Sequence, residues 1–209
     1  MEIVDYIKQF PLREFKKGDM LLAEGQQTAR LFALVKGFVK VTSIQESGNE
    51  QLLWIEGRYD VVPTEHLFSL SRTVSFYYTA LTDGTYYDID KASFIKFAKE
   101  TPAFMSEVAV NMSEHYDDLM NRLNGIGQTS VRAKLVSTLR YVAERFSADE
   151  TVDLYQLGLK LTHSDFAAMV GSTRETVSIE LHTLMSEGYI EYDRTKFTIY
   201  LSKIKENAQ

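Results

Sequence analysis

The chain has 209 residues, 44% of them hydrophobic and three of them proline, an ordinary globular composition with enough length for two small domains. It contains no cysteine, which excludes disulfide bonds, cysteine-ligated zinc and iron–sulfur clusters as features of this chain. The net charge of −6 divides into −5 over residues 1–127 and −1 over residues 128–209, so any surface for nucleic acid must concentrate its positive charge locally.

The first hundred residues alternate between short apolar or β-branched runs and turns rich in glycine, asparagine and aspartate. This pattern predicts β-strands over residues 20–22, 31–34, 38–43, 51–55, 74–82 and 85–89, followed by a helical stretch over residues 94–99. The N-terminal block is therefore expected to be rich in antiparallel β-structure.

A long helix follows, with Thr101 as a candidate N-cap and Pro102 in its first turn. Its apolar residues recur at alternating spacings of four and three, which is a heptad pattern typical of a coiled coil. The same face could instead pack on the β-rich block of its own chain, but we favour a dimer interface. The predicted interface consists of Met105, Ala109, Met112, Tyr116, Leu119, Leu123 and Ile126.

The sequence Asn-Gly-Ile-Gly at residues 124–127 predicts a loosened helix end that acts as a hinge. A new helix is expected over residues 130–146.

Two short helices with a tight turn between them are predicted near the C-terminus. Thr162 and Asp165 have the spacing of an N-cap and its reciprocal partner, and Gly171 supplies the positive φ that ends the first helix. Ser172 and Glu175 repeat the capping-box pattern at the start of the second helix. An apolar face of the second helix follows, made of Val177, Leu181 and Leu184.

The other side of this second helix carries Arg174, Glu175, Ser178 and Ile179. Arginine can pair with guanine O6 and N7, and glutamate can accept a hydrogen bond from cytosine N4. Glu175 could instead only complete a cap, and Arg174 could be a solvated charge. A β-hairpin with Asp193, Arg194, Thr195 and Lys196 at its tip follows. This order predicts a winged helix-turn-helix that binds DNA. The candidate DNA-binding residues are Thr162, His163, Ser164, Ser172, Thr173, Arg174, Glu175, Ser178, Ile179, Arg194 and Lys196.

This segment resembles the DNA-binding domain of the CRP/FNR family of bacterial transcription regulators, and the resemblance extends over nearly the whole chain. It implies a β-roll sensor domain, a dimerisation helix, double-stranded DNA and RNA polymerase as partners, and base contacts from Arg174 and Glu175. The family usually has a second arginine where this chain has Ile179. The matching C-terminal residues are Leu161-Thr162, Ala167, Val170-Gly171, Arg174 to Ser178, Leu181, Leu184 and Gly188 to Ile190. The weaker N-terminal match comprises Phe15 to Asp19, Glu24-Gly25, Leu31 to Thr42, Gly48 to Glu50 and Gly57 to Asp60.

The resemblance also raises the question of a small-molecule effector in the β-roll. Cyclic-nucleotide binders of the family carry a glycine-containing ribose motif and a phosphate-binding arginine, whereas this chain has Pro63-Thr64-Glu65 and Val74 at the matching positions. Arg72, which lies on the same strand face as Val74 or in a loop, is a possible substitute. A haem-sensing alternative would depend on His66 alone. No cofactor is expected, and the effector is either a molecule other than a cyclic nucleotide or absent. The candidate pocket comprises Thr64, Glu65, His66, Arg72, Val74 and Ser75.

Two other function classes fit the sequence less well. An enzyme on a cupin-like β-barrel would need clustered histidines, and His66 is alone among the first hundred residues. A β-roll interaction module that has lost DNA binding would suit Ile179 and the acidic charge, but Arg174 and Glu175 argue against it. No apolar run is long enough to span a membrane, and the first residues lack a signal-peptide pattern, so a cytoplasmic protein is expected.

The sequence therefore predicts an α+β protein with three parts: a β-roll sensor domain over residues 1–100, a dimerisation helix and hinge over 101–127, and a winged helix-turn-helix over 128–209. We expect a homodimeric, non-enzymatic transcription regulator that binds a near-palindromic operator.

Overall fold

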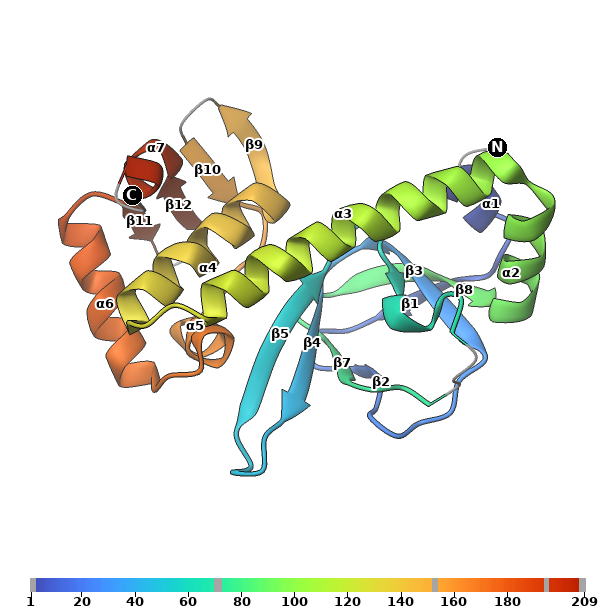
Figure 1. The fold of residues 1–209 in the computed structure, drawn as a ribbon, viewed down its shortest axis with the longest axis horizontal. Coiled ribbons are helices and arrows are strands. Elements are labelled where there is room, and N and C mark those ends of the chain that lie inside the picture. The colour runs from blue at the N-terminus through green and yellow to red at the C-terminus, as the bar shows by residue number, and fades with distance from the viewer. Residues whose placement is uncertain (1–2, 70–72, 152–153, 194–195, 207–209) are drawn as a thin grey trace. The chain divides into compact units, whose positions relative to one another are not determined.

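The computed structural model describes residues 3–69, 73–151, 154–193 and 196–206. The chain divides into two compact units, residues 1–117 and residues 118–209. Figure 1 labels the elements of both units.

The first unit is built on two four-stranded antiparallel sheets that form the β-roll. One sheet has the order β1 (Leu12–Phe15), β8 (Gly84–Asp90), β3 (Arg30–Lys36), β6 (Val61–Val62). The other has the order β2 (Met20–Leu22), β7 (Tyr77–Ala80), β4 (Val39–Ile44), β5 (Glu50–Glu56). The six strands predicted from the sequence are all present, while β1 and β6 were not predicted.

The strand predicted over residues 74–82 is shorter than expected, because β7 begins only at Tyr77. The backbone of Val74 bonds instead to a turn, donating to the Gln26 carbonyl (2.8 Å) and accepting from Gly25 N–H (2.9 Å). Val74 and Ser75 therefore belong to the segment that leads into the sheet.

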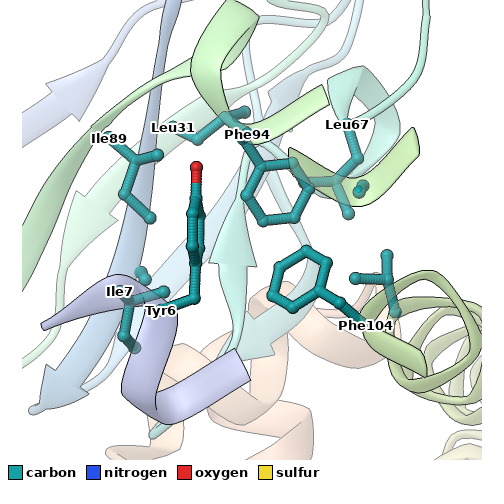
Figure 2. Close-up of a cluster of buried hydrophobic side chains, with 10 residues drawn as sticks. Tyr6, Ile7, Leu31, Leu67, Ile89, Phe94 and Phe104 are labelled. Atoms are coloured by element: carbon teal, nitrogen blue, oxygen red, sulfur yellow. The ribbon is translucent and has the colours of Figure 1, made fainter. Parts of the chain in front are cut away.

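Helices close one end of the β-roll over an aromatic core. They are α1 (Ile3–Ile7), the 3-10 turn η1 (Thr64–His66) and α2 (Lys91–Glu100), whose N-cap Asp90 accepts a hydrogen bond from Ser93 N–H. The predicted helix over residues 94–99 is thus confirmed and extended. Tyr6 stacks on Phe97 with ring centroids 4.1 Å apart, and Phe104 meets Tyr6 edge-on at 5.1 Å. Figure 2 shows how Tyr6, Phe94 and Phe104 converge on one another from α1, α2 and α3 (Pro102–Ile126).

The long helix α3 confirms the prediction of one, and it ends within residues 124–127, where a hinge was predicted. The helix continues to Ile126, and Gly125 is buried against α4 (Val131–Phe146). A Cβ atom at Gly125 would lie 2.6 Å from Ser137 Oγ, so glycine here permits close helix packing. The buried Arg122 adds hydrogen bonds to Thr138 Oγ1 (3.1 Å) and to the Met169 carbonyl. These contacts fix the end of α3 within the second unit.

The second unit is a winged helix-turn-helix. After α4 come β9 (Ser147–Thr151), β10 (Leu154–Leu157), α5 (His163–Val170), α6 (Arg174–Ser186), β11 (Ile190–Asp193), β12 (Lys196–Tyr200) and α7 (Leu201–Glu206). Its sheet has the order β11-β12-β10-β9. The β9–β10 hairpin was not predicted. The predicted α+β fold class is confirmed.

Apolar side chains from α4, α5, α6 and the wing strands form the core of the second unit. They are Leu135, Leu139, Phe166, Val177, Leu181, Leu184, Ile190, Phe197 and Ile199.

Candidate nucleic-acid interface

The turn between α5 and α6 is held at both ends by local hydrogen bonds. Thr162 caps α5 and accepts from Asp165 N–H (3.1 Å), and the Asp165 carboxylate accepts in return from Thr162 N–H (2.8 Å). Gly171 ends α5 with φ 66°, as the sequence predicted.

The predicted N-cap of α6 is wrong by one residue. Thr173, and not Ser172, caps the helix, with its hydroxyl accepting from Thr176 N–H (3.2 Å). The backbone N–H of Ser172 donates to the Ala167 carbonyl (3.1 Å), so Ser172 serves to close the end of α5. Glu175 consequently lies at the second helical position and does not complete a capping box.

Helix α6 separates a buried face from an exposed one. Val177, Leu181 and Leu184 are buried against the rest of the second unit. The opposite side exposes Arg174, Glu175 and Ile179, with Ser178 half-buried between them. Arg174 and Ser178 are one turn apart, as are Glu175 and Ile179, so they form one short surface stripe at the start of the helix.

His163 joins α5, α6 and the wing beneath this stripe. Its Nδ1 lies 3.0 Å from Ser178 Oγ, and its ring centroid lies 6.0 Å from that of His182 and 5.7 Å from that of Tyr192. Burial, then the neighbouring charges of His182 and Arg174, lowers the pKa of His163. A neutral imidazole is thus favoured, and its contact with Ser178 holds the stripe in place.

The remaining predicted DNA-binding residues flank the stripe. Thr162 and Ser164 are exposed at the start of α5, and Ser172 is half-buried in the turn. In the wing, Asp193 pairs with Lys196 in the β11–β12 register, while Arg194 lies outside the described residues. Among the predicted residues whose side chains are described, Thr162, Ser164, Thr173, Arg174, Glu175 and Ile179 are exposed, and His163, Ser172 and Ser178 are half-buried.

The predicted dimer interface on α3 is largely exposed. Tyr116 and Leu123 are 59% and 61% exposed, and Ala109 and Met112 are exposed as well. Met105, Leu119 and Ile126 are half-buried. Phe104 and Val108 of α3 are buried in the β-roll core and lie outside the heptad pattern, whereas Met105 of the pattern is partly buried and packs against the same core.

The candidate effector pocket contains a polar network that the sequence did not predict. Glu56, at the end of β5, is completely buried, and its Oε1 accepts from Trp54 Nε1 (2.9 Å) and from the Thr64 hydroxyl (3.1 Å). The buried Tyr78 donates to Glu65 Oε2 (2.6 Å), and burial together with the Glu65 charge raises the pKa of Tyr78. Two carboxylates are therefore bound by the chain's own donors.

The network also reaches α3, since His115 Nδ1 lies 4.0 Å from Glu56 Oε2. Of the other predicted pocket residues, His66 and Val74 are buried, Ser75 is exposed, and Arg72 lies outside the described residues.

Among the helices that the structure describes, none combines the length and the apolar composition needed to span a bilayer. Over the same residues, no three histidine, aspartate or glutamate side chains gather as a metal site.

Comparison with known proteins places both units in described families. Residues 12–101 match the cyclic nucleotide-binding domain, and residues 133–204 match the Crp-like helix-turn-helix domain.

Individual relatives align over nearly the whole chain. A CRP-like cAMP-activated global transcriptional regulator of Mycobacterium tuberculosis is 26% identical over 187 residues, covering 89% of this chain and 82% of the relative. The transcriptional regulator SdrP of Thermus thermophilus is 26% identical over 198 residues, covering 93% of each chain. The fold resembles that of a cyclic nucleotide-binding domain containing protein from Listeria monocytogenes, with a TM-score of 0.80, 15% identity, and coverage of 96% of this chain and 97% of that one.

Proposed function

The chain belongs to the CRP/FNR family of transcription regulators, and we propose that it acts as a homodimer that binds a near-palindromic operator. The observation that carries this proposal is the exposed stripe at the start of α6. Arg174 and Glu175 lie on the exposed side of a helix whose other side is buried in the core of the second unit. Such a helix can enter the major groove without unfolding any part of its own domain.

The chemistry of the stripe fits base recognition. We infer that Arg174 pairs with guanine and that Glu175 accepts a hydrogen bond from cytosine. No ion pair or hydrogen bond joins either side chain to another described residue, so neither has to break an internal contact to reach a base. Thr162, Ser164 and the wing would then contact phosphates and set the register of the helix on the duplex.

The exposed apolar face of α3 supports the dimer. Large apolar side chains at heptad spacing are costly to leave in water, and two copies of the helix would cover them by coiled-coil packing. A two-fold symmetric pair would present two α6 helices to half-sites roughly 34 Å apart. At a promoter, the bound dimer would act through RNA polymerase.

The polar network supports a β-roll that does not bind a cyclic nucleotide. A buried cyclic phosphate needs a cationic, charge-assisted donor. At the corresponding position this chain has the buried, apolar Val74, and the polar network adds the carboxylates of Glu56 and Glu65, while Arg72 lies outside the described residues. The cAMP activation named for the mycobacterial relative is therefore not transferred to this chain. We propose that its effector is another molecule or that DNA binding needs none.

Selection of random duplex DNA by the purified, unliganded protein tests the proposal. We expect an enriched inverted repeat with half-site centres about one helical turn apart, at modest salt because the domain is not basic overall. Addition of cAMP should leave the enriched sequence and its affinity unchanged. If no sequence is enriched with or without cell extract, the chain is not an operator-binding regulator, and an interaction module becomes the better explanation.

A further inference from the structure

Ile179 is the most exposed large apolar side chain in the described part of the chain, with 67% of its surface accessible. Helix α6 does not need it for packing, because Val177, Leu181 and Leu184 already fill the core side. An isoleucine at a solvent-facing helix position gains nothing from propensity, since β-branched residues are only moderate helix formers. A contact with a partner outside the domain would remove this apolar surface from water.

The neighbours of Ile179 place that partner at the DNA bases. Ile179 lies one turn after Glu175 on the same side of α6, so the two side chains are adjacent on the surface. The polar residue beside it, Ser178, is already in contact with His163 at 3.0 Å. Ile179 therefore continues the exposed stripe with a surface that has no hydrogen-bond donor or acceptor.

The backbone around Ile179 is well fixed. Its carbonyl accepts a hydrogen bond from the Thr183 hydroxyl (3.1 Å), and a β-branched side chain in a helix keeps mostly one χ1 rotamer. The methyl groups are therefore held in one place before any DNA arrives, which lowers the entropic cost of a contact.

Only one base presents an apolar group in the major groove, and that is thymine with its C5-methyl. We propose that Ile179 recognises this methyl group in each half-site, next to the base contacted by Glu175. The inference rests on the proposed operator binding and deepens it: the operator has a fixed thymine where an arginine at this position would select guanine.

Deoxyuridine gives a direct test, because it keeps every hydrogen-bonding group of thymine and lacks only the methyl. The enriched operator is synthesised with uracil at one symmetric pair of thymines at a time, and binding is measured with the full-length protein. Loss of one buried methyl contact should weaken binding about fourfold, and loss in both half-sites about fifteenfold. We expect this loss at one symmetric position only.

Two variants assign the effect to Ile179. Ile179→Ala should bind the thymine and uracil operators equally, whereas Ile179→Val, which keeps the branched methyl groups, should still prefer thymine. Ile179 is exposed in the free protein, so thermal unfolding of both variants should match that of the parent. If an operator is enriched but uracil weakens the parent and Ile179→Ala equally at every position, the inference is wrong while operator binding stands. If no operator is enriched, both proposals fail together.

Discussion

Arg174 is the residue whose loss should weaken operator binding most. The Arg174→Ala variant should lose about 1–3 kcal/mol of binding free energy per half-site and relax the base preference at one symmetric position. The helix should remain intact, because Arg174 is exposed and the cap is made by Thr173. Fluorescence anisotropy against the selected operator, and against duplexes changed at each base pair in turn, measures both effects at fixed salt.

The control for charge is Arg140→Ala, which removes the same charge from the exposed Arg140–Glu144 pair on α4. A general electrostatic effect would weaken both variants alike and leave base preference unchanged. That pattern, or full affinity in Arg174→Ala, would remove Arg174 from its proposed role.

The hydrogen-bonding role of a single residue was predictable from the sequence where its partner lies within one helical turn. The Thr162–Asp165 capping box is such a case, because both members are three residues apart. The choice between Ser172 and Thr173 depends on how α5 closes, which uses a bond back to Ala167, and that bond has no sequence signature. The burial of Glu56 could not be predicted from the sequence for the same reason, because its hydrogen-bond partner Thr64 belongs to a different element.

At the level of elements, the packing of α3 on α4 depends on one glycine. Gly125→Ala places a methyl group 2.6 Å from Ser137 Oγ and 3.1 Å from Ser137 Cβ, so the Ser137 hydroxyl must rotate away and its Cβ must move back slightly. We expect a loss of about 1–3 kcal/mol of unfolding free energy from overpacking, partly offset by the better helix propensity of alanine. Urea unfolding of the full-length protein, followed by circular dichroism, measures the change.

Gly127→Ala is the matched control, since its Cβ would approach nothing more closely than 3.4 Å, at the Leu123 carbonyl. It should unfold at the same urea concentration as the parent or slightly above. Equal stability of the two variants would show that Gly125 is not required for the close approach of α3 and α4.

Strands were predictable where a short apolar or β-branched run is bounded by turn residues, as in β3, β4 and β5. The two residues of β6 are too few to show a period. Strand β9, with the sequence Ser-Ala-Asp-Glu-Thr, carries no apolar alternation and exists through its pairing with β10. Strands of this kind form through pairing with distant residues, and the local sequence pattern does not predict them.

For the whole molecule, the division after Asp117 falls inside α3, so one helix belongs to both units. The sequence predicted a hinge at the Asn-Gly-Ile-Gly segment over residues 124–127. Contacts made by Arg122 and Gly125 tie the end of α3 to α4 and α5. Burial lowers the pKa of Arg122 to about 10, so the guanidinium still carries its charge at neutral pH. The part of α3 from Asp118 onward is thus joined to the second unit by these contacts.

The dimer proposed for this molecule gives the last prediction. Leu123→Glu places a charge on the exposed heptad face of α3, where the free chain tolerates it because the side chain is already 61% accessible. Two such charges facing each other across a coiled coil would be both desolvated and repulsive, so the variant should be monomeric by light scattering. Asn121→Glu adds the same charge on the opposite side of the helix and should remain dimeric.

Operator binding by Leu123→Glu should then fall by one to several orders of magnitude, since each half-site is bound without the effective concentration that the partner provides. Binding to an isolated half-site should stay at the level of the parent, because α6 and its stripe are unchanged. A variant that remains dimeric would place the interface elsewhere. A monomer that still binds the full operator like the parent would mean that recognition does not depend on pairing of two helix-turn-helix units.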